Sequence, residues 1–312
     1  MDGRSLYFTG RETVELRSRS VDPTREEVVV ETRFSAISAG TELLVYRGEA
    51  PSDLPADETL DALDGDLSYP LRYGYAAVGD VAETGTAVDD DWLGRTVLAF
   101  NPHETRFTAT PSALVPVPDD LTPTEMTLYP PVETATTLVM DGRPRIGERV
   151  VVFGAGVIGL CTVARLSSFP LSELVVVEPL ADRRERALTL GADDAVTPDA
   201  FSPDRWNDAA GAAGADLVYE LSGQPDALDA AVDAAGYDGR VVVGSWYGTK
   251  SDPEVRGRWT RERRSEVTLD GLATLPADVL ITHRVPIEEA AKAYRLIDQR
   301  RDGALQVLFE YP

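Results

Sequence analysis

The pattern of apolar and polar residues differs between parts of the chain, and the first change lies between residues 120 and 150. In the first part, short runs alternate apolar and polar positions, as at 27–34 and 97–100, and clusters of glycine, proline and aspartate separate them. A period of two is typical of strands that bury one face. We therefore expect residues 1 to about 120 to consist of β-structure.

Continuous apolar runs replace the alternation from about Arg149 onward. Such runs are typical of strands that are covered on both faces. Segments with helical periodicity separate them, and this alternation predicts βαβ units around a parallel sheet. The expected strands are residues 150–153, 174–178, 216–220 and 240–244, and the expected helices include 181–190 and 226–235. The predicted fold class is therefore α/β with a doubly wound parallel sheet.

The C-terminal segment has a third pattern. Residues 285–294 are amphipathic and contain Pro286 near their start, which predicts a helix that begins at the proline. Residues 304–311 are mostly apolar and predict a final strand.

A glycine-rich motif directly follows the first of the continuous apolar runs. It reads Gly154, Ala155, Gly156, Val157, Ile158 and Gly159. The pattern GxGxxG also occurs in ordinary turns, but a strand before it and a helix after it are typical of dinucleotide binding. Gly154 permits the tight turn, Gly156 lets the backbone approach a pyrophosphate, and Gly159 lets the helix pack closely on the strand. The amino end of the helix then offers free N–H groups to the phosphates.

An acidic residue lies where such a site binds the adenosine ribose. Glu178 follows Gly159 by 19 residues, at the end of the second expected strand. A carboxylate there accepts hydrogen bonds from the ribose hydroxyls and repels a 2′-phosphate, which favours NAD(H) over NADP(H). Arg183 and Arg184 follow closely and could pair with that phosphate, so NADP(H) stays open. Both arginines could equally be the solvated start of a helix.

Composition excludes several classes of function. The formal charge of −23 argues against nucleic-acid binding, and no apolar stretch approaches the roughly 20 residues that span a bilayer. The amino terminus lacks the pattern of a signal peptide, so we expect a cytoplasmic protein that acts on a small molecule.

Only Lys250 and Lys292 are lysines, which is typical of halophilic surfaces, although an acidic mesophilic protein is the alternative. The single cysteine, Cys161, lies in an apolar run and is expected in a core.

The chain resembles the medium-chain dehydrogenase/reductase superfamily over nearly all of its length. Besides the glycine motif, residues 216–223, 239–244 and 280–284 carry the resemblance. It implies a GroES-like catalytic domain, residues 1–120 and 284–312, and a Rossmann domain, residues 121–283. It also implies a homodimer, and it assigns a further set of residues to the cofactor. These are Arg183 near the adenosine ribose, Ser222, and Gly244 and Ser245 beside the nicotinamide.

The chain departs from the superfamily where the zinc-dependent members bind their metal. Ala39 replaces the first ligand, Tyr75 replaces the next in Gly74-Tyr75-Ala76, and the third region reads Tyr129-Pro130-Pro131-Val132. Zinc needs about four N, S or O ligands, and this set does not supply them. The comparison therefore implies an enzyme without catalytic zinc. Residues 35–42 are most similar to the bacteriochlorophyllide hydroxyethyl dehydrogenase group, which suggests an alcohol oxidation on a bulky ring compound.

Four residues are candidates for the acid–base work that zinc would otherwise assist. By the resemblance, Thr41 holds the substrate oxygen, although it could be a turn threonine. Tyr75 could donate a proton or simply fill the metal space. His103 lies in a loop, and histidines suit general acid–base catalysis; a solvated loop histidine is the alternative. Glu133 begins the helix between the domains, and its role as acid, orienting group or interface residue stays open.

Three functions are compatible with these residues. The first is a zinc-independent NAD(H) oxidoreductase that interconverts an alcohol and a ketone or aldehyde. The second is an enone or quinone reductase of the same superfamily. The third is a cofactor-binding protein without catalysis. Loops at 53–66 and 249–262 are expected to determine the substrate.

Overall fold

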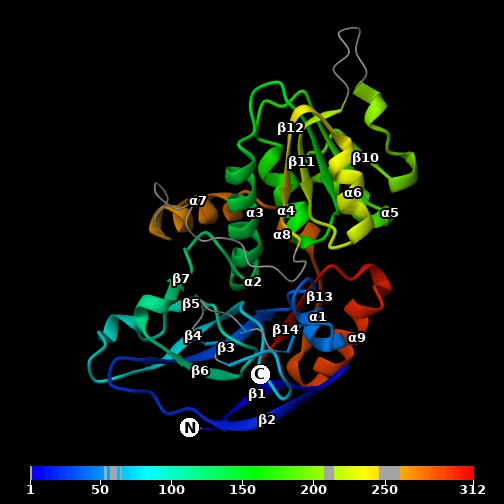
Figure 1. Ribbon diagram of the computed structural model, residues 1–312. Coiled ribbons are helices and arrows are strands. Elements are labelled where there is room, and N and C mark those ends of the chain that lie inside the picture. Colours follow the sequence, from blue (N-terminus) through cyan, green and yellow to red (C-terminus); the bar gives the residue numbers. More distant parts are fainter. Residues whose placement is uncertain (1, 53–54, 57–61, 64, 207–213, 246–260) are drawn as a thin grey trace. The chain divides into compact units, whose positions relative to one another are not determined.

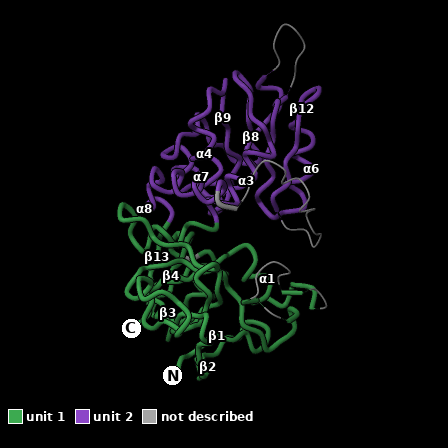
Figure 2. The backbone as a smooth tube through the Cα atoms, turned by 90° about the vertical axis from the view of Figure 1, so that its left-hand side faces the viewer, with its two compact units in different colours: residues 1–130, 281–312 green, residues 131–280 purple. Residues whose placement is uncertain are grey.

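The computed structural model describes residues 2–52, 55–56, 62–63, 65–206, 214–245 and 261–312 (Figure 1). These form two compact units (Figure 2). Unit 1 consists of residues 1–130 and 281–312, and unit 2 of residues 131–280. Among the described helices, none is both long enough and apolar enough to cross a bilayer.

Unit 2 is built around a parallel sheet. Its strands are β8 (Arg149–Phe153), β9 (Glu173–Val177), β10 (Asp194–Val196), β11 (Ala215–Glu220) and β12 (Ala235–Val243). They lie in the order β10-β9-β8-β11-β12, and each neighbouring pair is parallel. This order reverses direction between β8 and β11, as in the Rossmann fold, where ligands bind at the reversal. The predicted fold class is confirmed.

Helices cover this sheet because its strands are apolar on both faces. Those that pack on its strands are α4 (Val157–Leu166), α5 (Ala181–Thr189) and α6 (Pro225–Ala234), and the unit also contains α3 (Tyr129–Gly142), α7 (Arg261–Ala273) and α8 (Ala277–Leu280). Val151, Val175 and Val218 share a buried cluster with Ala231 of α6. Val150 and Val152 are equally buried and alternate with Val151, so they point to the opposite face.

Unit 1 is rich in antiparallel strands. They are β1 (Asp2–Gly10), β2 (Thr13–Ser20), β3 (Val28–Ala36), β4 (Ala77–Thr84), β5 (Thr96–Ala99), β6 (Arg106–Ala109), β7 (Leu114–Pro116), β13 (Ile281–Pro286) and β14 (Gln306–Glu310). The main sheet runs β13-β14-β3-β4-β5-β7, with β6 beside β3, whereas β1 and β2 form a hairpin. The helices of this unit are α1 (Glu42–Arg47), α2 (Pro123–Met126) and α9 (Ala290–Asp298).

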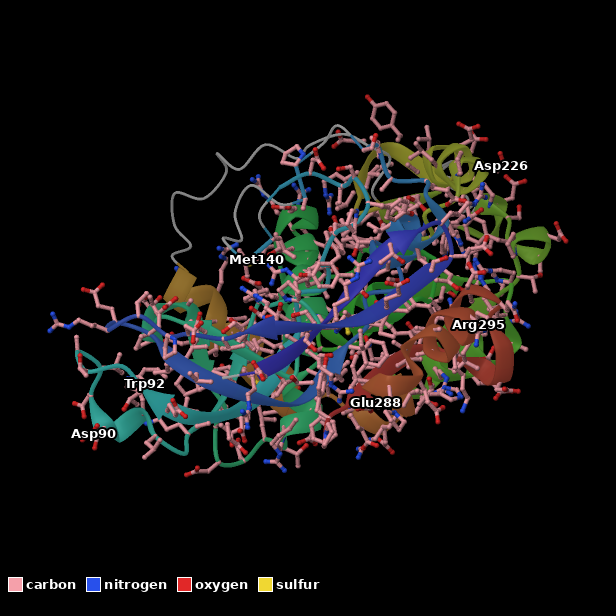
Figure 3. The ribbon with its side chains drawn as sticks, turned by 90° about the horizontal axis from the view of Figure 1, so that it is seen from below. Asp90, Trp92, Met140, Asp226, Glu288 and Arg295 are labelled. Atoms are coloured by element: carbon pink, nitrogen blue, oxygen red, sulfur yellow. The ribbon has the colours of Figure 1, made fainter. Side chains whose placement is uncertain are left out.

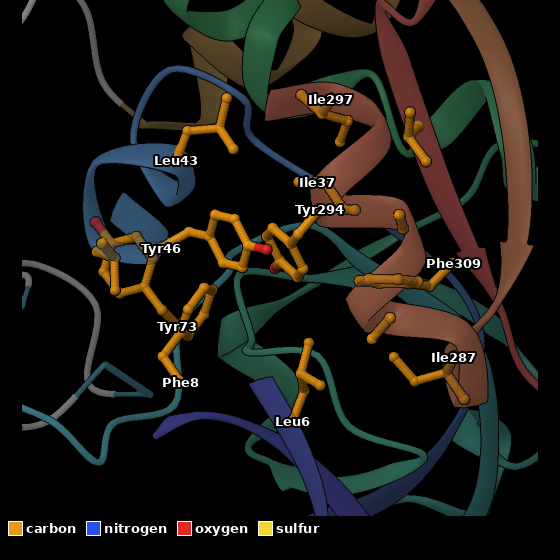
Figure 4. Close-up of a cluster of buried hydrophobic side chains, with 14 of the residues drawn as sticks. Leu6, Phe8, Ile37, Leu43, Tyr46, Tyr73, Ile287, Tyr294, Ile297 and Phe309 are labelled. Atoms are coloured by element: carbon orange, nitrogen blue, oxygen red, sulfur yellow. The ribbon is translucent and has the colours of Figure 1, made fainter. Parts of the chain in front are cut away.

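Aromatic side chains form the centre of the main core of unit 1 (Figure 4). Tyr294 of α9 is fully buried, and its ring contacts Phe8 edge-on and Tyr46 in a stack, each at 5.2 Å between centroids. Phe309 of β14 packs beside them. This core joins β1, α1, α9 and β14, which lie far apart in the sequence.

The structure corrects the expectation that residues 1 to 120 contain only β-structure. Helix α1 follows Thr41, buries Leu43 and Tyr46 in the core, and ends at Gly48, whose φ is 68°. A left-handed glycine is a common helix terminator. The helix is too short for its periodicity to stand out in the sequence.

The expected helix at 285–294 begins later than predicted. Val285 and Pro286 continue β13, where they pair with Phe309 and Glu310 of β14. Since β13 is an edge strand, Pro286 needs no ladder hydrogen bond. A turn carrying Glu288, whose carboxylate pairs with Arg4 of β1, leads into α9 (Figure 3).

The two units meet along the chain at 130/131 and 280/281, whereas we expected 120/121 and 283/284. Helix α2 explains the first difference, because it packs against β3 and β4 of unit 1. Met126 and Leu128 are fully buried there. Of the substrate loops expected at 53–66 and 249–262, most residues lie outside the described chain, although Leu63 is buried in the core of unit 1.

Candidate functional site

The glycine motif of unit 2 forms a tight loop between β8 and α4. Gly154 has a φ of 96°, and a side chain there would meet the Ser222 backbone at 2.7 Å. A Cβ on Gly159 would lie 2.0 Å from the carbonyl oxygen of Gly154, whereas one on Gly156 would meet nothing within 4 Å. The loop is thus tightly packed at Gly154 and Gly159 and has open space at Gly156, which is the shape that a bound pyrophosphate requires.

The other members of the motif lie at the start of the helix. Gly156 is the N-cap of α4, and Val157 and Ile158 form its first turn. Ala155 is fully buried, and its N–H group donates to Oε2 of Glu178 at 2.8 Å. The amino end of this ten-residue helix therefore faces the open side of the loop.

Glu178 follows β9 and is nearly buried. Its Oε2 accepts from the N–H of Ala155, and its Oε1 accepts from the N–H of Leu180 at 3.0 Å. Arg184 donates to the carbonyl oxygens of Glu178 and Pro179, both at 2.8 Å. The guanidinium of Arg184 is therefore engaged with the backbone beside Glu178, and Arg183 lies partly exposed in the first turn of α5.

A second polar group lies where β11 and β12 end. Glu220 is fully buried, and its Oε1 accepts from the N–H and the hydroxyl of Ser222 at 2.8 and 2.5 Å. Gly244 donates its N–H to the carbonyl oxygen of Glu220, and Ser245 accepts from Gly223 at 2.8 Å. The three expected cofactor residues at these positions therefore lie around Glu220, Ser222 at its carboxylate and Gly244 and Ser245 at its backbone carbonyl group, at the same sheet edge as the glycine motif.

Three hydroxyl groups lie together in unit 1. Thr41 precedes α1, and its Oγ1 lies 3.0 Å from the Oγ of Ser38 and 3.0 Å from the phenol oxygen of Tyr75. Ser38 and Tyr75 are also hydrogen-bonded to each other. All three side chains are half-buried. We call Ser38, Thr41 and Tyr75 the hydroxyl trio.

His103 lies behind the hydroxyl trio, not in a solvated loop. It is 0% exposed, so the solvated alternative is wrong. Its Nε2 lies 3.0 Å from Oε2 of Glu42, and its Nδ1 lies 2.7 Å from Oγ of Ser35. Backbone hydrogen bonds hold the loop from β5 to β6 against β1, from the N–H of Leu6 to the carbonyl oxygen of His103 at 2.9 Å and from the N–H of Thr105 to that of Arg4 at 2.8 Å. Glu104, next to His103, is also buried and paired with Arg19 and Arg72.

The residues at the expected metal positions do not fit zinc. Ala39 has no donor, Tyr75 offers a phenol that Ser38 and Thr41 already bind, and Pro130 has no side-chain donor. Within the described ranges, no group of three His, Cys, Asp or Glu side chains is placed to hold an ion. Glu133, the remaining catalytic candidate, lies partly exposed in α3 of unit 2.

Sequence reasoning missed several residues of both groups. Glu42 and Glu220 are fully buried carboxylates, and Ser38 is part of the hydroxyl trio. A signal existed for Glu220, since it ends a continuous apolar strand, and for Glu42, since it follows Gly40 and Thr41 directly. Tyr294 and Tyr311 also join Glu42 and Ser35, but nothing local in the sequence indicates this.

Comparison with known proteins identifies relatives of the chain. Residues 157–272 match the family described as zinc-binding dehydrogenase, a range that excludes positions 39, 75 and 130. D-guloside 3-dehydrogenase of Escherichia coli (strain K12) is 29% identical over 241 residues, which cover 73% of this chain and 68% of that protein. Sorbitol dehydrogenase 1 of Saccharomyces cerevisiae (strain ATCC 204508 / S288c) is 28% identical over 280 residues, covering 73% and 78%.

A solved structure confirms the fold. A short chain alcohol dehydrogenase from Escherichia coli CFT073, complexed with cofactor NADH, superposes with a TM-score of 0.79 at 19% identity. The match covers 99% of both chains. At this identity the likeness establishes the arrangement of the backbone.

Proposed function

Because this chain is an oxidoreductase of the medium-chain dehydrogenase/reductase superfamily, we propose that it interconverts an alcohol and a ketone or aldehyde with NAD(H) and without zinc. The observation that carries the proposal is the hydroxyl trio, which contains the position of a lost metal ligand, Tyr75. The relatives named for D-guloside and sorbitol both act on hydroxyl compounds, which supports an alcohol as substrate.

The cofactor, when bound, carries the hydride, and the protein supplies orientation and a proton. In the reducing direction, Tyr75 donates its phenolic proton to the carbonyl oxygen as that oxygen gains charge. Ser38 then donates to the phenol oxygen and Thr41 donates to Ser38, and this relay stabilises the phenolate that remains. Oxidation of the alcohol reverses the proton transfer. The trio thus performs the polarising role for which zinc-dependent enzymes use the metal.

The cofactor residues favour NAD(H). The carboxylate of Glu178 repels a 2′-phosphate, and Arg184, which could have paired with one, is held by two backbone carbonyl groups. The dinucleotide would be held by the open side of the loop at Gly156, by the amino end of α4, and by Ser222, Gly244 and Ser245.

The proposal also includes a cytoplasmic homodimer from a halophile. Its substrate is a small molecule, with a bulky ring compound among the candidates.

Two substitutions test the trio. Thr41→Val keeps the shape and removes the hydroxyl, so kcat and kcat/KM should fall together by about 10²–10³ while NADH affinity stays unchanged. Tyr75→Phe should cause a comparable loss and flatten the pH–rate profile. Thr13→Val in β2 and Tyr7→Phe in β1 are matched controls elsewhere in unit 1 and should leave turnover unchanged.

The assay uses sorbitol and a panel of secondary alcohols with NAD, and the corresponding ketones and a set of enones with NADH. Reduction of enones without any alcohol oxidation would contradict the proposed reaction. Turnover of both variants within about threefold of wild type, below 1 kcal/mol in barrier height, would refute the assignment of the trio.

A further inference from the structure

A series of hydrogen bonds, buried at Ser35, His103 and Glu42, lies behind the hydroxyl trio. The phenol oxygen of Tyr311 lies 2.8 Å from Oγ of Ser35, and that Oγ lies 2.7 Å from Nδ1 of His103. Nε2 of the same ring lies 3.0 Å from Oε2 of Glu42. His103 and Glu42 both have fully buried side chains. These hydrogen bonds therefore connect Tyr311, near the end of the polypeptide, to Glu42 at the start of α1.

The directions of these hydrogen bonds follow from the acceptor at one end. The carboxylate of Glu42 only accepts, so Nε2 of His103 donates to it. In a neutral imidazole Nδ1 is then the acceptor, so Ser35 donates to His103 and Tyr311 donates to Ser35. Burial raises the pKa of Tyr311, which keeps the donor proton on its phenol. Both ring nitrogens of His103 have hydrogen-bonding partners, so neither is available to a substrate.

Glu42 also holds the loop that carries Ser38 and Thr41 through two hydrogen bonds to Ser38. Its Oε1 accepts from the N–H of Ser38 at 2.7 Å, and its own N–H donates to the carbonyl oxygen of Ser38 at 2.9 Å. The loop is therefore clamped in both directions. Tyr294 donates to the other oxygen, Oε2, at 2.5 Å, and burial raises the pKa of this phenol as well.

His103 also supports the segment that carries Tyr75. Gly74 has a φ of 113°, and a Cβ there would lie 2.7 Å from Nε2 of His103. The imidazole ring thus packs directly against the backbone next to Tyr75. The trio comes from two segments, and the His103 side chain contacts a residue of each. These are Glu42, which holds the loop of Ser38 and Thr41, and Gly74, which precedes Tyr75.

We infer that His103 and Glu42 are positioning residues that hold the three hydroxyls of the trio in register, and that His103 is not the proton donor. The inference rests on the proposed function. A displacement of about 1 Å in a reacting group can cost on the order of 10²-fold in rate. The rate therefore depends on the relative positions of the three hydroxyls, which come from two segments and which His103 and Glu42 hold in place.

Two replacements of His103 separate positioning from proton transfer. Glutamine can place an N–H group near the position of Nε2 and still donate to Glu42, but it does not titrate. Asparagine is too short to reach Glu42. We therefore expect His103→Gln to keep kcat within about threefold of wild type, and His103→Asn to lower kcat about 10²-fold with an unchanged shape of the pH–rate profile.

Glu104 provides the matched control for Glu42. It is the other fully buried carboxylate in this region, but its partners are Ser5, Arg19, Arg72 and Asn101, which lie outside the trio. Glu42→Gln should lower kcat to the same extent as His103→Asn. Glu104→Gln should lower thermal stability while kcat per folded molecule stays at the wild-type value.

Hydrogen exchange tests the inference without any substrate. The Ser38 amide, protected by Glu42, should exchange faster in Glu42→Gln and His103→Asn and at the wild-type rate in Glu104→Gln. Tyr294→Phe, which removes one hydrogen bond to Glu42 and keeps the ring, serves if the other variants do not fold. A wild type that turns over no alcohol would refute the proposed function, yet the exchange result would still decide the positioning role.

Three results would overturn the inference. An equal loss of kcat in His103→Gln and His103→Asn, with a flattened pH–rate profile, would show that His103 transfers the proton. Wild-type kcat in His103→Asn would show that the trio does not depend on it. Unchanged exchange at Ser38 in Glu42→Gln would show that the clamp does not hold the loop.

Discussion

Two alanine substitutions in the glycine motif should affect different properties, stability at Gly159 and NADH affinity at Gly156, although the positions are only three residues apart. A Cβ on Gly159 would lie 2.0 Å from the carbonyl oxygen of Gly154, so a backbone atom has to move. Overpacking costs about 1–3 kcal/mol, and a backbone clash this close belongs at the upper end. Alanine regains about 1 kcal/mol as a helix former. The net loss should be about 2 kcal/mol.

For Gly156 the same change meets open space. Its φ of −70° and ψ of −176° suit any residue, and no atom lies within 4 Å of the added Cβ. Glycine is preferred over alanine at an N-cap, so the cost in stability should stay below about 1 kcal/mol. The new methyl group would instead occupy the space that the pyrophosphate needs. NADH affinity should fall at least about tenfold, or 1.4 kcal/mol.

Thermal unfolding and NADH titration, followed by fluorescence, distinguish the two effects. At about 2–4 °C per kcal/mol, Gly159→Ala should lower the Tm by about 4–8 °C, and Gly156→Ala by clearly less. NADH binding to Gly156→Ala within threefold of wild type would refute the placement of the pyrophosphate. A Gly159→Ala protein as stable as wild type would refute the packing argument for that glycine.

Three further predictions concern metal, cofactor preference and pH. Purified protein should contain no stoichiometric zinc and keep its activity with chelators; one tightly bound zinc per chain with chelator-sensitive turnover would contradict the proposal. Glu178→Ser combined with Pro179→Arg should shift preference from NAD(H) toward NADP(H), measured as the ratio of kcat/KM values; a wild type that already prefers NADP(H) would show that the assignment of Glu178 is wrong. Burial raises the pKa of the Cys161 thiol from 9.0 to about 12, so the unfolded chain loses this proton first as the pH rises. The free energy of unfolding should therefore fall more steeply above pH 9 in wild type than in Cys161→Ala, and equal slopes in urea titrations would show that the thiol is not protected.

The sequence alone determined the elements whose signal is local. The strands of unit 2 are continuous valine-rich runs, and such runs are buried wherever they occur in a covered sheet. The turn at Gly154 is equally local, because its φ of 96° is a conformation that favours glycine. Strand, turn and helix follow one another within a few residues, so the elements on both sides of the cofactor motif could be predicted from the adjacent sequence.

Only the tertiary structure decided the environment of the candidate catalytic residues. The expectation of a purely β front half missed α1, because six residues show too little periodicity and its buried face depends on the distant residue Tyr294. The edge position of β13 likewise allowed Pro286 to end a strand where the sequence predicted the start of a helix.

His103 shows the same limit most clearly. Its neighbours in sequence are a proline and a glutamate, which are typical of an exposed loop, yet its partners Ser35 and Glu42 lie 68 and 61 residues away. Ser38 and Tyr75 meet across 37 residues. Periodicity along the chain records which face of an element is buried, whereas the identity of a hydrogen-bonding partner depends on how distant segments pack, and that is settled only when the whole unit folds.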